Sequence, residues 1–315
     1  MRFAPLSLLL AFAAPAMAAR APALPPLLPL ELAAAAPLID VALAGQRLRL
    51  TVDLGAGDVV QINPESSASA MLAATTRADG KSADRGRYRV AVGQTTLAIP
   101  FSHETLLIAG RAVKARVLTP AAAPPGQPPD SDGTIGLPLL PHSMITLRWR
   151  PESSGDGKVR VPARTGRSDA FGFDWRLPGA ALLDVELHPL RAATVASAAA
   201  ASHLAQAGGG RLHGPVRREL IAYGAIRPVR QLRLDRPVAI AGLALAVTDV
   251  RLFDWAGRSD LPPDAETDPA LIVVGRRGRQ GGWAVLKLGR DLLGSCASIS
   301  WQRQPGQFEL HCPAS

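Results

Sequence analysis

The pattern of apolar and polar positions along this 315-residue chain is that of short β-strands separated by turn residues. Alternating or apolar runs occur at residues 38–43, 48–52, 88–92, 96–101 and 113–118. Gly, Asn and Asp punctuate these runs, and the same texture resumes at Gly179 and continues to the C-terminus. The pattern predicts an all-β fold built from two stretches of strands.

Two short helices and three connecting segments complete the predicted organisation. One helix is expected to start at Asn63-Pro64, an N-cap followed by proline, and the other to run from Gly214-Pro215 to Gly224. A Pro-rich loop is expected at residues 119–133. Residues 19–36, rich in Pro and Ala, are expected to form a linker, and residues 151–178 a connection between the two halves, 37–150 and 179–315.

Residues 1–18 are typical of a secretory signal. Arg2 supplies the positive start, residues 6–14 form a short apolar run, and Ala16-Met17-Ala18 fits a cleavage site. Because a membrane-spanning helix needs about 20 apolar residues, this run predicts export and no stable membrane anchor. The mature protein is expected to begin near Ala19 in the periplasm or outside the cell.

Charge and cysteine content narrow the class of protein. The net charge of +9 comes mostly from scattered arginines, and aromatic residues make up 4% of the chain, a combination that argues against a nucleic-acid partner. The two cysteines, Cys296 and Cys312, flank runs 298–302 and 307–311, which look like a hairpin turning at Gln304-Pro305-Gly306, and a disulfide is expected between them. The six histidines show no metal-ligand spacing, and neither a metal nor another cofactor is expected.

The two halves resemble each other in sequence. An offset of 144 positions superimposes residues 37–53 on 181–197 without a gap and matches Asp40 with Asp184 and Arg47 with Arg191. A second pair of similar segments, 135–140 and 288–293, follows in the same order. Two motifs in one order predict an internal duplication.

The most informative segment is Leu48-Arg49-Leu50-Thr51-Val52-Asp53-Leu54-Gly55-Ala56-Gly57. An apolar strand leads into an acidic residue, a glycine and small residues, so the Asp53 carboxyl group is expected in a tight turn among apolar neighbours. Such surroundings raise the pKa of a carboxyl group and suit acid–base chemistry. A structural turn aspartate is the alternative interpretation.

This segment resembles the active-site loop of the aspartic peptidases of the pepsin and retropepsin type, which reads hydrophobic, Asp, Thr or Ser, Gly, Ala. Residues 132–137 and 285–289 resemble the segment that closes each lobe of that family. The resemblance covers nearly all of residues 37–312 and implies two pseudo-symmetric lobes with a cleft between them. It also implies that Asp53 is one of two catalytic aspartates, which share a proton and activate a water.

The resemblance also implies a degenerate second loop. Under the offset of 144 the counterpart of Asp53 is Ser197, which is too weak an acid to serve as the second carboxyl group. The hydroxyl residue that follows each aspartate in the family is replaced by Leu54 and Ala198, and Ala199 stands where the family has glycine. A large–small contact between Leu54 and Ala198 is expected to replace the lost polar contact.

Three functions are consistent with these features. The first is an aspartic-type endopeptidase that hydrolyses peptide bonds through a water held by Asp53. The second is a non-catalytic pseudo-peptidase that uses the cleft to bind a peptide or protein. In either case a monomer is expected, since both lobes are in one chain. The third, outside this family, is a β-sandwich adhesion or carbohydrate module.

Overall fold

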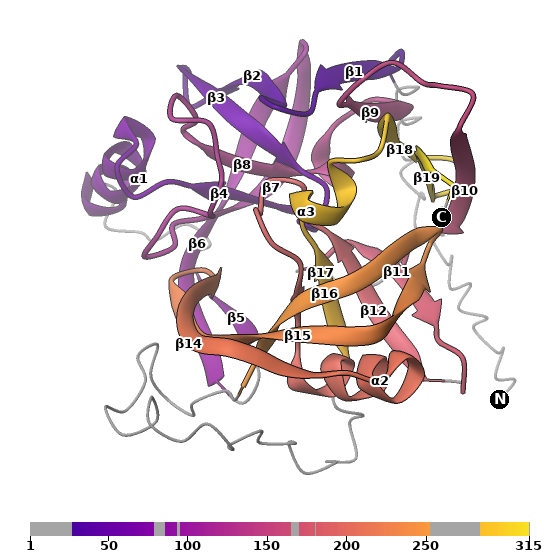
Figure 1. Ribbon diagram of the computed structural model, residues 1–315. Coiled ribbons are helices and arrows are strands. Elements are labelled where there is room, and N and C mark those ends of the chain that lie inside the picture. The colour runs from indigo at the N-terminus through magenta and orange to yellow at the C-terminus, as the bar shows by residue number, and fades with distance from the viewer. Residues whose placement is uncertain are drawn as a thin grey trace, which may run out of the picture.

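The computed structural model describes residues 27–78, 86–92, 95–164, 170–179, 181–252 and 284–314 (Figure 1). The described residues are mostly β-strand, as the sequence predicts, and their strands form three sheets. The expected signal sequence lies outside the described residues. Within the described ranges, no helix has the length and apolar character needed to cross a membrane.

The first half of the chain forms a seven-stranded sheet. Its strands, in spatial order, are β2 (Leu38–Leu43), β3 (Gln46–Asp53), β8 (Gly133–Gly136), β4 (Val59–Ile62), β7 (Arg111–Leu118), β6 (Thr95–Ile108) and β5 (Gly86–Val92). An additional pairing between β2 and β6 closes part of this sheet into a barrel. All five strands expected in this half are present, which confirms that part of the prediction.

The second half forms another seven-stranded sheet. Its strands, in spatial order, are β11 (Gly172–Arg176), β12 (Leu182–Leu187), β17 (Val285–Leu288), β13 (Val195–Ala196), β16 (Leu243–Arg251), β15 (Ala225–Ile240) and β14 (Arg211–Ala222). The neighbours β12, β17, β13 and β16 pair parallel, antiparallel and parallel in turn. The neighbours β3, β8, β4 and β7 of the first sheet pair in the same sequence of directions. Strand β12 therefore takes the place in its sheet that β3 takes in the first.

A five-stranded sheet joins the two halves. Its order is β1 (Leu30–Ala33), β9 (Met144–Arg148), β18 (Ser298–Gln302), β19 (Gln307–Pro313) and β10 (Asp156–Pro162). Strand β1 lies in the expected linker, and β10 and β11 lie in the expected connection, so both segments have more structure than predicted. Buried apolar side chains such as Val161 and Phe173 anchor the connection, although residues 151–157 are mostly Ser, Gly and acidic residues.

The helices differ most from the prediction. In the part of the chain that the structure describes they are α1 (Ser67–Ala78), α2 (Ala198–Gly208) and the single turn α3 (Arg290–Leu293), with a 3-10 turn η1 at Leu137–Leu139. Helix α1 begins four residues after Asn63. The helix predicted from Gly214 to Gly224 is wrong, because residues 214–222 belong to β14 and residues 223–224 form the turn that follows it. Pro215 is tolerated there since it falls at a register irregularity, between His213 and Arg217, of the edge strand.

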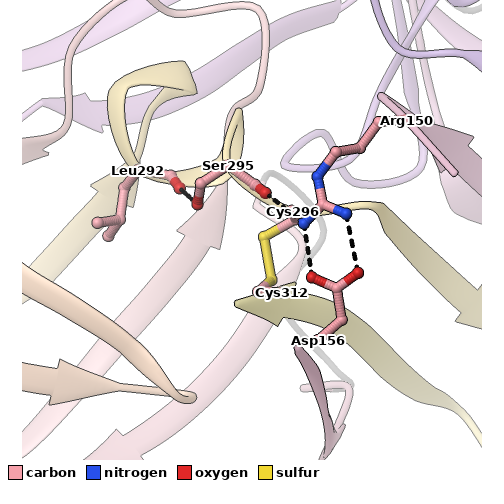
Figure 2. Close-up of a disulfide and its surroundings, with 6 residues drawn as sticks. All are labelled: Arg150, Asp156, Leu292, Ser295, Cys296 and Cys312. Carbon is pink, nitrogen blue, oxygen red and sulfur yellow. Dashed lines mark hydrogen bonds and ion pairs between the residues drawn. A yellow bond between two sulfur atoms is a disulfide. The ribbon is translucent and has the colours of Figure 1, made fainter. Parts of the chain in front are cut away.

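The expected disulfide is present. Cys296 and Cys312 are bonded at one end of the β18–β19 hairpin. Figure 2 shows Arg150 close to this bond. Its guanidinium group donates two hydrogen bonds to Asp156, at 2.8 and 2.5 Å, and one to the Ser295 carbonyl oxygen at 3.0 Å. Hydrogen bonds from Arg150 and from Ser153 hold the pKa of Asp156 well below its usual range. These contacts fasten the start of β10 to the C-terminal hairpin.

Candidate functional site

Asp53 lies at the end of β3, at the contact between the two halves. Only 7% of the residue is exposed, and Oδ1 accepts a hydrogen bond of 2.9 Å from the Gly55 backbone N–H. Leu54 is fully buried, Ala56 forms a bridge with Ala170, and the Gly55 carbonyl oxygen accepts from the Phe171 N–H at 2.9 Å. The loop is thus held in place by the residues of the connection that lead into β11.

The strand registers identify the position in the second half that corresponds to Asp53. In the first sheet Asp53 pairs with Gly136, the last residue of β8. In the second sheet Leu187 pairs with Leu288, so the next residue along each strand is His188 and Gly289. The His188 N–H also donates to the Leu288 carbonyl oxygen at 2.8 Å. By this register the counterpart of Asp53 is His188.

Ser197 occupies a different position from the one expected of it. It is the N-cap of α2, and its hydroxyl oxygen accepts hydrogen bonds from the backbone N–H groups of Ala200 at 3.2 Å and Val285 at 3.0 Å. Ala198 and Ala199, expected in an active loop, are the first residues of α2. The gapless offset of 144 matched β2 with β12, one strand out of step, since β12 takes the place of β3.

His188 and Asp53 approach each other across the two halves. His188 Nδ1 lies 3.6 Å from Asp53 Oδ1, and both side chains are largely buried, with 14% and 10% exposed. A Cβ atom at position 55 would come within 2.4 Å of the His188 ring. The glycine of the first loop therefore makes room for the imidazole of the second.

A second carboxylate lies behind the imidazole. Glu186 Oε2 is 2.8 Å from His188 Nε2 and 3.0 Å from Lys287 Nζ. Burial alone would raise the pKa of Glu186, but the Lys287 ammonium and His188 together outweigh burial and hold that pKa well below its ordinary value. Glu186 is therefore a carboxylate at neutral pH, and His188 lies between two acidic side chains.

Arg191 extends this charged group into the second half. It donates to the carbonyl oxygens of Ile221 at 3.1 Å and Leu220 at 2.7 Å and contacts Glu219 Oε1 at 3.2 Å. Burial lowers the pKa of Arg191, while the negative charges of Glu219, Asp53 and Glu186 act in the opposite direction. Arg191 therefore both ties the second loop to β14 and adds positive charge near the Asp53–His188 pair.

The two glycines at the ends of β8 and β17 serve the same purpose in their sheets. A Cβ atom on Gly136 would lie 1.8 Å from the Gly57 carbonyl oxygen, and one on Gly289 would lie 2.4 Å from the Ala193 carbonyl carbon. The missing side chain lets residues 53–58 pass directly against Gly136 and lets residues 188–194 pass directly against Gly289. Both glycines lie in the segments 135–140 and 288–293, which resemble each other in sequence.

Beside the two loops, the halves meet through an apolar cluster. Its fully or nearly fully buried members are Val59, Tyr88, Val90, Ile99 and Leu118 from the first half and Val195, Ile221, Ala225 and Val229 from the second. The cluster joins the hairpin β5–β6 to the hairpin β14–β15. Because its members are buried against one another, a ligand could enter this contact only if the hairpins moved apart.

The arrangement differs chemically from a pair of catalytic aspartates. Two adjacent carboxyl groups share one proton, whereas Asp53 faces an imidazole whose other nitrogen contacts Glu186. When His188 is protonated, it can donate toward both carboxylates and hold them in place. Among the residues that the structure describes, no group of three or more His, Cys, Asp and Glu side chains is arranged to hold a metal ion.

Comparison with known proteins adds no identification, since no protein-family model and no curated protein matches the chain. Sequence reasoning singled out Asp53 and the two segments that contain the glycines at the ends of β8 and β17, and it did not include His188, Glu186, Lys287 or Arg191 among the candidate site residues. His188 directly follows the strand at residues 182–187, as Asp53 follows 48–52, but two carboxylates, Asp184 and Glu186, interrupt the apolar pattern there and leave no comparable local signal.

Proposed function

We propose that this chain is an exported, non-catalytic relative of the two-lobed aspartic peptidases, which binds an extended peptide where its halves meet once the hairpins β5–β6 and β14–β15 have moved apart. In this account the halves are diverged copies of one lobe. The shared order and direction of strand pairing supports the duplication, as do the matching glycines Gly136 and Gly289. The disulfide is compatible with an oxidising compartment.

The observation that carries the proposal is the pairing of Asp53 with His188 rather than with a second carboxyl group. Peptide hydrolysis by an aspartate pair needs one carboxylate as base and one carboxylic acid as donor. Here the donor position is an imidazole that Glu186 holds from behind. Loss of one acid–base partner typically costs about 10²–10⁴ in rate, which removes most of the activity.

A second candidate function is slow hydrolysis through this mixed pair. Asp53 would hold the attacking water, and protonated His188 would donate to the scissile carbonyl oxygen. The favouring observation is that Asp53 Oδ1 keeps its hydrogen bond from the Gly55 N–H, which orients the carboxylate, while His188 Nδ1 faces it at 3.6 Å. The two candidates make opposite predictions about cleavage by the wild-type protein.

Both candidates can be tested with one peptide library, applied between pH 3.5 and pH 8 to the mature protein. Mass spectrometry detects new termini, and capture on immobilised protein detects bound peptides. We expect the immobilised protein to retain peptides and mass spectrometry to detect no new termini. Asp53→Asn and the matched control Asp58→Asn, an exposed aspartate five residues away, should behave alike in the cleavage assay. Cleavage by wild type and Asp58→Asn that Asp53→Asn abolishes would establish the hydrolase instead.

A further inference from the structure

The sheet of the second half has a polar face on the side away from α2. Leu232 and Leu234 of β15 belong to or pack against the main core together with Leu204 of α2. Side chains alternate between the faces of a strand, so Val229, Gln231 and Arg233 point to the opposite face. In Figure 1, β14, β15 and β16 form the orange part of this sheet, with α2 against β15.

The strand registers arrange this opposite face into three rows. Each row contains one residue from β14, one from β15 and one from β16. The rows are Arg211, Arg233 and Val247; His213, Gln231 and Asp249; and Arg217, Val229 and Arg251. The ion pair between Arg217 and Asp249 and the 3.0 Å hydrogen bond from Arg233 to Gln231 agree with one shared face.

The face carries a strong excess of positive charge. The three rows contain one carboxylate, that of Asp249, which is bound by Arg217, whereas the first row alone adds the two positive charges of Arg211 and Arg233. Arg211 and Arg233 are both exposed and stand directly opposite each other on neighbouring strands. Like charges in a cross-strand pair are destabilising, and an anion that contacts both guanidinium groups would relieve this repulsion.

The spacing of the rows fits an extended chain. The first and third rows are four residues apart on β15, which corresponds to about 13 Å at the rise of a β-strand. An extended peptide with acidic residues four positions apart presents two carboxylates at the same spacing. Val229 of the third row is fully buried in the apolar cluster, so such a peptide would reach this row through Arg217, whose side chain is 54% exposed.

We propose that this face, the Arg211–Arg251 face, is a binding site for acidic segments of extended peptides or proteins. Arginine pairs carboxylates through two parallel hydrogen bonds, which gives the site its preference over neutral chains. Nucleic acid fits less well, because the nine side chains of the rows include no Phe, Tyr or Trp on which bases could stack. The inference does not depend on Asp53 or His188.

The test measures fluorescence anisotropy of a labelled peptide with Glu at two positions four residues apart. The full mature protein is compared with Arg211→Gln/Arg233→Gln and with a charge-matched control, Arg47→Gln/Lys114→Gln, on exposed positions of β3 and β7. We expect the Kd to rise at least about tenfold in the first variant and to stay within about twofold in the control. Replacing Glu by Gln in the peptide should weaken binding of the wild type to a similar degree, and added salt should do the same.

Four results would overturn the assignment. They are equal affinity for the Glu and Gln peptides, equal loss in both double variants, tighter binding of a single-stranded oligonucleotide or of anionic lipid vesicles than of the Glu peptide, and dimerisation in sedimentation that Arg211→Gln/Arg233→Gln abolishes. Asp53→Asn should bind the Glu peptide like the wild type. A negative result for peptide binding at the Asp53–His188 site would therefore not affect this inference. A negative result with the Glu peptide would likewise not affect the proposed function.

Discussion

Replacement of Glu186 by glutamine tests the charged group behind the candidate site. Glu186 is 5% exposed, and its carboxylate contacts His188 and Lys287 at 2.8 and 3.0 Å. Glutamine keeps the size of the side chain but removes the charge. Losing one partner of a fully buried ion pair costs about 3–5 kcal/mol. The Lys287 side chain is 21% exposed, so water can solvate its ammonium group in the variant and reduce this cost. We expect the free energy of unfolding to fall by about 2–3 kcal/mol at pH 7.

The same variant predicts a definite pH dependence. Since the pKa of Glu186 is lowered on folding, the unfolded state binds more protons than the folded state as the pH falls. The contribution of Glu186 to stability is therefore complete above the unfolded value, 4.5, and is lost progressively below it. The difference in stability between wild type and Glu186→Gln should be constant from pH 7 to pH 5.5 and shrink from pH 4.5 downward.

Urea unfolding followed by tryptophan fluorescence, at several pH values between 7 and 3.5, measures both quantities. The control is Glu65→Gln, an exposed glutamate, which should change stability by no more than about 0.5 kcal/mol. A loss below about 1 kcal/mol for Glu186→Gln at pH 7 would refute the reasoning. So would a difference that stays the same, or grows, as the pH falls below 4.5.

Three further substitutions test parts of the fold. Ser197→Ala should cost about 1–2 kcal/mol in urea unfolding, whereas Ser197→Asp, which keeps a capping oxygen, should cost less than half as much; the reverse order would contradict the N-cap assignment. Gly136→Ala should destabilise strongly, or prevent folding, because its Cβ would meet a carbonyl oxygen at 1.8 Å, while Gly155→Ala, with no atom closer than 4.0 Å, should be tolerated; comparable thermal unfolding of the two would count against the close approach. Cys296→Ala/Cys312→Ala opens a loop with a sequence separation of 16 and should lower stability by about 3 kcal/mol in the chain-entropy model, and an unchanged unfolding midpoint would argue against it.

The sequence predicted the strands well because alternation of apolar and polar residues is a local signal. Strands β2, β3, β5, β6 and β7 were found this way, as was the hairpin that carries the disulfide. The helices were predicted poorly. Asn63-Pro64 opens a turn rather than α1, and Pro215 was taken for a helix start although an edge strand accommodates it.

The site could be predicted only in part, since it depends on pairing between distant segments. Asp53 was recognisable from its own neighbours along the chain. His188 was not, because its role follows from the parallel pairing of β12 with β17, two strands about a hundred residues apart. A gapless comparison also cannot allow for the different loop lengths of the halves, and it therefore selected Ser197.

The central claim is that Asp53 and His188, one from each half, form a single paired site. A double-mutant cycle on unfolding free energies tests it most directly, with Asp53→Asn, His188→Asn and both together. We predict a coupling energy of about 0.5–3 kcal/mol, the range for residues in contact. The parallel cycle between Asp53→Asn and Ser197→Ala should give no more than about 0.5 kcal/mol. Additive effects for Asp53 and His188, or coupling of Asp53 to Ser197 instead, would contradict the account.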